Sequence, residues 1–135
     1  RNAMMIKLIS VFLENKPGRL LYLLRVLSDA QVNLQALSLA DTADFGIARI
    51  IVDDLEGALR AIQEHGMTAI TTEVLRVEVP DVPGGLANNI IAPLAQAEVN
   101  IEYSYGYSTH TAGKAVVVLK VDNLDKAMRA LSLEG

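Results

Sequence analysis

Cysteine is absent from this 135-residue chain, and histidine occurs only twice. The absence of cysteine excludes disulfide bonds, thiolate metal sites and a cysteine nucleophile. His65 precedes Gly66 at the predicted end of a helix, where a histidine interacts favourably with the helix dipole. His110 lies in a polar loop without a neighbouring Cys, Asp or second His. We therefore expect neither a metal site nor a cofactor.

Basic residues, aromatic residues and long apolar runs are also scarce. Twelve Lys and Arg against sixteen Asp and Glu give a net charge of −4, without the basic surface that sequence-independent nucleic-acid binding requires. No apolar run approaches the roughly 18–20 residues of a membrane span. The N-terminus lacks the pattern of a secretory signal, and Arg1 to Ala3 ahead of Met4 resemble the remnant of an expression tag. We expect a cytoplasmic protein that binds neither nucleic acid nor membrane.

The chain carries one pattern twice. ENKPGRL at 14–20 returns as PDVPGGL at 80–86, and VDDLEGALRAI at 52–62 returns as VDNLDKAMRAL at 121–131. A repeat of this length indicates two copies of one supersecondary unit. Units of roughly 65 residues lie near the lower limit of independent stability, so each half is expected to need the other.

Hydrophobic periodicity predicts the order β-α-β-β-α-β in the first copy. The predicted elements are strand 5–13, helix 19–30, strands 33–40 and 45–52, helix 54–65, strand 69–79, helix 84–97, strands 100–107 and 115–121, and helix 125–131. This order predicts an α+β protein of two tandem ferredoxin-like units, 4–72 and 73–135, each with an antiparallel sheet and both helices on one face. The chain ends where the last strand of the second unit is due, so that unit is predicted to lack this strand or to receive it from another chain.

One helix of the second copy departs from the repeat. Pro93 lies about ten residues into helix 84–97, where proline removes a hydrogen bond and clashes with the preceding turn. The offset between the two copies also grows by one residue within this helix. We predict a kink or a π-bulge there, because helices absorb an extra residue in that way.

The repeated loops are the candidate binding sites. Gly18 and Gly84 each begin a helix directly after a strand, where free backbone N–H groups and the helix dipole favour an anion such as a carboxylate. Side-chain oxygens suited to an ammonium group come from Asn15, Asp81, Asn33 and Asn100. Carboxylate and ammonium together describe a free amino acid. The same residues also form an ordinary strand-to-helix turn, and the residues by themselves leave both interpretations open.

ENKPGRL, a helix and then QVNLQAL resemble the ACT domain, a small-molecule regulatory module of amino-acid metabolism that is also found in bacterial phosphoglycerate dehydrogenase. The resemblance covers essentially the whole chain as two units. It implies a non-catalytic sensor, a homodimer that binds a free amino acid at an interface between units and passes the signal to a partner enzyme or transporter. The ligand-binding residues it implies are Asn15, Pro17, Gly18, Arg19, Leu20, Asn33, Asp81, Gly84, Gly85, Leu86 and Asn100.

The match to the family is uneven at several positions. Leu13 stands where the serine-binding copy in phosphoglycerate dehydrogenase has histidine, so serine is not the expected ligand, and a Leu13 near the pocket would favour a more hydrophobic amino acid. Asn15 and Arg19 in one loop against Asp81 and Gly85 in the other predict that at most one loop binds tightly.

Two alternative functions use a related fold. A regulatory subunit of the acetolactate synthase type would carry an additional C-terminal domain. An acylphosphatase-like hydrolase would need a glycine-rich phosphate cradle with an arginine and a catalytic Asn on the neighbouring strand. Arg19 follows the first loop, but Gly85 takes its place in the second.

Overall fold

The computed structural model describes residues 3–41, 45–107 and 112–132, so His110 lies outside the described part. The elements are β1 (Ala3–Glu14), α1 (Arg19–Asp29), β2 (Leu34–Asp41), β3 (Phe45–Val52), α2 (Leu55–Glu64), β4 (Thr68–Pro80), η1 (Ala87–Ile91), α3 (Ala92–Gln96), β5 (Ile101–Tyr107), β6 (Lys114–Val121) and α4 (Leu124–Ser132). Every strand and helix predicted from periodicity is present. The strands form one sheet in the order β2-β3-β1-β4-β6-β5.

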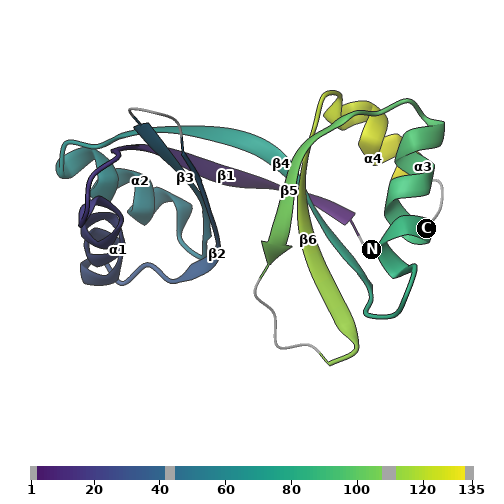
Figure 1. Ribbon diagram of the computed structural model, residues 1–135, viewed down its shortest axis with the longest axis horizontal. Coiled ribbons are helices and arrows are strands. Elements are labelled where there is room, and N and C mark those ends of the chain that lie inside the picture. Colours follow the sequence, from purple (N-terminus) through teal and green to yellow (C-terminus); the bar gives the residue numbers. More distant parts are fainter. Residues whose placement is uncertain (1–2, 42–44, 108–111, 133–135) are drawn as a thin grey trace. The chain divides into compact units, whose positions relative to one another are not determined.

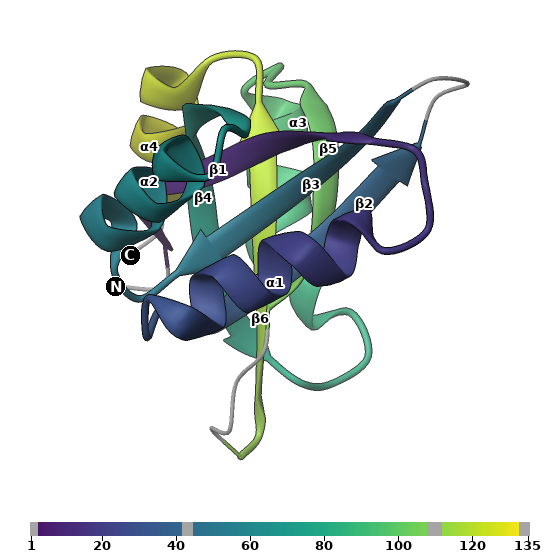
Figure 2. The same cartoon turned by 90° about the vertical axis from the view of Figure 1, so that its left-hand side faces the viewer.

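The contacts divide the chain into two compact units, Lys7–Thr72 and Arg1–Ile6 with Glu73–Gly135. We call them the N-terminal unit and the C-terminal unit. In the N-terminal unit the strand order is β2-β3-β1-β4, and α1 and α2 cover one face of the sheet (Figures 1 and 2). This is the predicted ferredoxin-like arrangement.

Strand alternation explains how the N-terminal unit builds its core. β1 and β3 are antiparallel, with Ile9 opposite Ile50 and Leu13 opposite Gly46. Every second residue of these strands faces the helices, since side chains alternate across a sheet. The buried core consists of Ile9, Val11, Leu13, Leu23, Leu27, Val32, Ala48, Ile50, Ala58 and Ile62. These residues are aliphatic throughout, as the composition predicts.

The C-terminal unit repeats this design with β5, β6 and β4 and with its helices on one face of the sheet (Figure 1). Its core consists of Leu75, Val77, Val79, Ile90, Leu94, Val99, Leu119, Val121, Ala127 and Leu131. No strand follows α4 within the described residues, which end at Ser132.

The start of β1 takes the position of that missing strand. Residues 3–6 belong to the C-terminal unit, β1 neighbours β4 in the sheet, and Ala3 packs against the C-terminal core. The sequence assigns residues 4–6 to the first domain and leaves the edge of the second unit open or completed by another chain. Instead, β1 contributes to the sheets of both units. Its 12 residues are enough for the first few to belong to the C-terminal unit and the rest to the N-terminal unit.

The predicted irregularity near Pro93 is a π-helix, η1, followed directly by α3. In a π-helix the backbone N–H bonds one residue further back than in an α-helix. The Asn89 side chain adds a hydrogen bond here, since its Nδ2 donates to the Gly85 carbonyl four residues earlier at 2.8 Å. The prediction of a kink or π-bulge is therefore confirmed.

Candidate ligand-binding site

The first loop turns the chain from β1 into α1 with three backbone hydrogen bonds. Lys16 N–H donates to the Glu14 carbonyl at 2.9 Å, Arg19 N–H to the Lys16 carbonyl at 3.3 Å, and Tyr22 N–H to the Gly18 carbonyl at 2.9 Å. Gly18 has φ +88°, the left-handed region that favours glycine. A Cβ at Gly18 would meet no atom within 4 Å, so the backbone angle, and not space, requires glycine here.

Charged side chains gather around this loop. Glu14 forms ion pairs with Arg19 at 3.1 Å and with Lys16 at 3.6 Å, and the guanidinium of Arg19 also lies 5.7 Å from the centre of the Tyr22 ring. Tyr22 in turn contacts the ring of His65 edge-on at 6.2 Å between centroids. All three ionic side chains are about half exposed, so these pairs add little stability. They place the Arg19 guanidinium between Glu14 and the Tyr22 ring, beside the loop.

A cavity of about 150 Å³ opens beside these side chains. Its polar residues come from the loop and its apolar residues come from α1 and the ends of three strands. The lining residues are Glu14, Asn15, Lys16 and Arg19 on the polar side, and Leu13, Leu20, Leu39, Ala40 and Gly46 on the other. A small molecule with a charged end and an apolar end matches this division.

A second hollow of about 260 Å³ adjoins the first. Leu13, Glu14 and Arg19 line both, and the second is completed by Phe12, Tyr22 and the turn Gly66 to Thr68. The ion pair of Glu14 and Arg19 is therefore shared by the two spaces.

Asn15 and Asn33 do not meet within the N-terminal unit. Asn15 follows Glu14, which is opposite Phe45, whereas Asn33 precedes Leu34, which is opposite Val52. These positions on β3 are seven residues apart, which corresponds to roughly 23 Å at about 3.3 Å per residue. Asn33 lines a different hollow of about 410 Å³, together with Leu24, Leu27, Ser28, Gln31, Val32 and Leu34.

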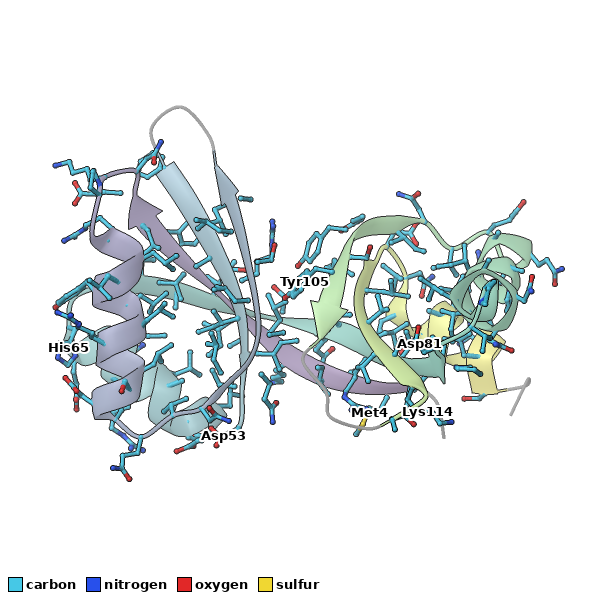
Figure 3. The ribbon with its side chains drawn as sticks, turned by 60° about the horizontal axis from the view of Figure 1, so that its bottom comes forward. Met4, Asp53, His65, Asp81, Tyr105 and Lys114 are labelled. Carbon is cyan, nitrogen blue, oxygen red and sulfur yellow. The ribbon has the colours of Figure 1, made fainter. Side chains whose placement is uncertain are left out.

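Asn33 is fixed by an aspartate that sequence analysis did not single out. Its N–H donates to Asp53 Oδ1 at 2.9 Å, and the Asp53 N–H donates back to the Asn33 carbonyl at 3.1 Å. Figure 3 shows Asp53 at the end of the unit where α1 ends. Asn100 and Asp122 repeat both bonds at 3.0 Å. The Asn33–Asp53 and Asn100–Asp122 pairs thus join β2 to β3 and β5 to β6 at their ends.

The second loop has the same backbone turn but different surroundings. Gly84 has φ +80°, and a Cβ there would come within 2.9 Å of Asn88 Nδ2, so the Asn88 side chain covers the glycine that is open in the first loop. At Gly85, a Cβ would collide with the Pro80 carbonyl oxygen. Gly85 is the counterpart of Arg19, so the local backbone has no room for an arginine.

The two loops also differ in charge. Residues 14–20 contain Lys16, Arg19 and Glu14, a sum of +1, whereas residues 80–86 contain only Asp81, a sum of −1. A carboxylate is therefore favoured electrostatically at the first loop and disfavoured at the second.

Five residues of the 150 Å³ cavity had escaped sequence analysis as site residues, and one of them is Glu14 at the end of β1. Lys16 lies within the loop, and Leu39, Ala40 and Gly46 come from the hairpin of β2 and β3. Only the pairing of β3 with β1, which sets Gly46 opposite Leu13, reveals that the hairpin closes the site. In the part of the chain that the structure describes, no group of His, Asp and Glu could hold a metal ion. None of the described helices has the length and apolar character needed to cross a membrane.

The chain is a duplicated ferredoxin-like fold, built from two related units, with a small cavity of polar and apolar residues beside its first strand-to-helix loop. A family model described as "ACT domain pair" matches residues 4–134. The chain belongs to this family.

Solved structures support the same fold. Protein BT0572 from Bacteroides thetaiotaomicron is 39% identical, with a TM-score of 0.89 over 99% of this chain and 91% of that chain. The ligand-free regulatory subunit of aspartate kinase from Thermus thermophilus is 15% identical, with a TM-score of 0.64 over 98% and 96% of the two chains. The corresponding subunit from Thermus flavus is 16% identical, with a TM-score of 0.62 over 98% and 96%. No curated protein matches the chain.

Proposed function

We propose that this protein is a non-catalytic, cytoplasmic regulator that binds a free amino acid at its first loop and signals occupancy to a partner protein. The observation that carries the proposal is the cavity of about 150 Å³ between the loop and the strand ends. Lys16 and Arg19 suit a carboxylate, the Asn15 side-chain oxygen suits an ammonium group, and the aliphatic wall suits a side chain.

We further propose that the site is completed by a unit of a second chain. Asn15 and Asn33 lie roughly 23 Å apart in one unit. One amino acid is far shorter than this, since neighbouring Cα atoms of a chain are only about 3.8 Å apart. A single ligand therefore cannot contact both residues of the same unit. Two units related by a twofold axis perpendicular to their strands run antiparallel, so the Asn33 end of one unit can lie beside the Asn15 end of the other. A homodimer satisfies this requirement, and sedimentation of the free and ligand-bound protein tests it.

The partner is proposed to be an enzyme or transporter of amino-acid metabolism. Regulatory subunits of aspartate kinase share this fold at 15–16% identity. This likeness supports a role as a separate regulatory chain, but it does not identify the enzyme that is regulated. A ligand regulates such a partner only if it binds two conformations with different affinity. Hydrolysis of an acyl phosphate is disfavoured, because Arg19 is engaged by Glu14 and Tyr22 and has no counterpart in the second loop.

A thermal-shift screen of the twenty amino acids, followed by calorimetry, tests the function. An amino acid at 100 times its Kd adds about 2.7 kcal/mol to the free energy of unfolding, which is roughly 9 °C for 135 residues. Asn15→Ala should abolish this shift. Asp81→Ala is the matched control in the acidic loop and should retain it.

The proposed function is wrong if no amino acid stabilises the wild-type protein. The site assignment is wrong if a ligand stabilises the Asn15→Ala variant as much as the wild type. Turnover of an acyl phosphate would replace the proposal with an enzymatic function.

A further inference from the structure

We infer that a second copy of this chain docks on the edge of the N-terminal unit where α1 lies beside β2, and that the corresponding edge of the C-terminal unit stays outside this dimer. The inference rests on the proposed function, because it names the surface through which a second chain completes the first-loop site. Four features carry it: the leucines of that edge, the strand at its border, the charges at its two ends, and the different edge of the C-terminal unit.

Five leucines of β2 and α1 form a surface that we call the leucine edge. Its members are Leu21, Leu24, Leu34, Leu37 and Leu39. Leu37 lies opposite Ile50 and Leu39 lies opposite Ala48, and both partners belong to the core. Leu37 and Leu39 therefore face the helix layer, since paired residues share one face of a sheet. Even so, Leu37 is 38% exposed and Leu39 is 53% exposed.

The helix side of the leucine edge is aligned with β2. Leu21, Leu24 and Ser28 are spaced three and four residues apart, so they share one side of α1. Leu24 and Ser28 line the 410 Å³ hollow together with Leu34 of β2. That side of α1 therefore points toward the edge strand, and Leu21, which is 50% exposed, extends the apolar surface.

The strand at the border of this surface is open to pairing. β2 is an end strand of the sheet, and such a strand presents backbone N–H and C=O groups that can pair with a strand of another chain. Native proteins protect exposed edges with charged side chains, among other devices. Residues 34–40 of β2 include no charged residue. The leucine edge thus offers an apolar surface and a strand for pairing side by side.

The C-terminal unit provides an internal comparison. The repeat and the strand pairing give the three exposed leucines small or polar counterparts, which are Ser104 for Leu37, Gly106 for Leu39 and Ala87 for Leu21. The two half-buried leucines keep half-buried aliphatic counterparts, Ile91 for Leu24 and Ile101 for Leu34. The positions that pack inside each unit are therefore apolar in both copies, whereas the outward positions are apolar only in the N-terminal unit. One unit of this fold does not need the exposed leucines, so their role lies outside the unit.

The other end strand, β5, is less suited to pairing. At the position of Gln35 in β2 it carries Glu102, which forms an ion pair with Lys120 at 3.2 Å. A charged side chain on an edge strand opposes pairing with another strand. Both end strands have a register irregularity near their first residues, so this feature does not distinguish them. We therefore place the second copy on the leucine edge.

The charges at the two ends of the leucine edge favour a second copy in antiparallel orientation. Lys16 and Arg19 outnumber Glu14 at the loop end. At the other end Asp29 ends α1, and Asp53 accepts a hydrogen bond from the residue before β2 (Figure 3). A twofold axis perpendicular to the strands pairs β2 with itself and brings the basic end of each copy beside the acidic end of the other. A parallel neighbour would bring like charges together.

This dimer places the candidate site at the interface. The 150 Å³ cavity is lined by Leu39 and the 410 Å³ hollow by Leu24 and Leu34, so both spaces lie along the leucine edge. In the antiparallel pair, the cavity of each copy lies toward the hollow of the other. An amino acid bound there contacts both copies and therefore strengthens the dimer.

Sedimentation velocity of variants with an added charge tests the inference. Leu37→Lys and Leu21→Lys each place a charge on the leucine edge, and neither residue is among those that line the first-loop cavity. Each variant should weaken the dimer about a hundredfold or more, because the charge loses water at an apolar interface and a twofold axis introduces it twice. Ser104→Lys and Ala87→Lys are matched controls at the same positions of the repeat, and both should remain dimers like the wild type.

A further pair of variants tests the orientation. Asp29→Lys should weaken the dimer about tenfold, because it sets like charges together twice, once at each end of the interface. Gln96→Lys is the matched control, because Gln96 ends α3 as Asp29 ends α1, and it should leave the dimer unchanged. An Asp29→Lys dimer as tight as the wild type refutes the antiparallel orientation.

The outcomes separate this inference from the proposed function. A wild type that stays monomeric with and without a mixture of the twenty amino acids overturns the inference, and binding of an amino acid by that monomer leaves the binding function intact. A dimer that binds no amino acid upholds the leucine edge and overturns the binding function. Leucine-edge variants that remain dimers, or controls that become monomers, place the interface elsewhere.

Circular dichroism and the thermal midpoint show whether each variant folds. If Leu37→Lys or Leu21→Lys fails to fold, Leu37→Ser and Leu21→Ala decide, because they copy the residues of the C-terminal unit. The double variant should be a folded monomer at concentrations where the wild type is a dimer. A double variant that dimerises as tightly as the wild type overturns the inference.

Discussion

Replacing Gly85 with alanine tests why the two repeated loops have diverged. Gly85 is buried where the second loop leads into η1, and its added Cβ would collide with the carbonyl oxygen of Pro80. The Pro80 carbonyl is held in place, since it also accepts a hydrogen bond from Val82 N–H at 2.9 Å. The backbone must therefore move to admit even one methyl group.

The expected destabilisation is about 1–2 kcal/mol. Forcing an extra methyl group into a close-packed site costs about 1–3 kcal/mol. Alanine offsets about 0.4–1 kcal/mol of this, because it restricts the unfolded chain more than glycine does. With an unfolding entropy of about 2.1 cal/mol/K per residue, a chain of 135 residues loses roughly 4–7 °C in its thermal midpoint.

Scanning calorimetry and urea denaturation of Gly85→Ala and Gly106→Ala provide the measurement. Gly106 also lies outside the left-handed region, but its Cβ would meet no atom within 4 Å. Gly106→Ala should therefore be neutral or up to about 1 kcal/mol more stable. The reasoning is refuted if Gly85→Ala is as stable as the wild type, because the second loop could then accept an arginine like Arg19.

Three further changes probe the fold. Leu23→Ala should cost about 3–5 kcal/mol in urea denaturation, since Leu23 is fully buried in the N-terminal core; a loss below about 1 kcal/mol would contradict that packing. Asp53→Ala should cost about 1 kcal/mol by removing the acceptor for Asn33 N–H, and equal stability would show that the bond is dispensable. Gln31→Gly should raise the free energy of unfolding by about 0.5 kcal/mol, and with it the thermal midpoint, because Gln31 has φ +60°; a lower midpoint would refute this.

Local sequence patterns predicted nearly all the secondary structure. The largely apolar run 45–52 after a polar turn predicts a strand with the bounds of β3, and the Leu spacing after Arg19 predicts α1. The inserted residue beside Pro93 even predicted the π-helix, because the repeat supplies an undistorted copy for comparison. These signals are local, since hydrogen bonds within a helix and side-chain alternation along a strand depend on neighbouring residues.

The candidate site was predicted only in part. Asn15, Arg19 and Leu20 line the cavity, as the loop motif suggests, and their role as ligand contacts remains a prediction. Asn33 lies at the other end of the unit, because β1 and β2 run in the same direction on either side of β3. The loop residues could be found by motif, whereas Leu39 and Gly46 have no motif and enter the site through strand pairing.

The sequence by itself determined the repeat, the class of fold and the two loops that differ in charge, because each is written in residues close together in the chain. Tertiary structure decided which strand completes the C-terminal unit and which residues close the cavity. Residues 3–6 lie beside a strand about seventy positions further along the chain. Gly46 lies opposite Leu13, although α1 and β2 separate the two residues in the sequence. Such contacts depend on the register of the sheet, which local propensity does not specify.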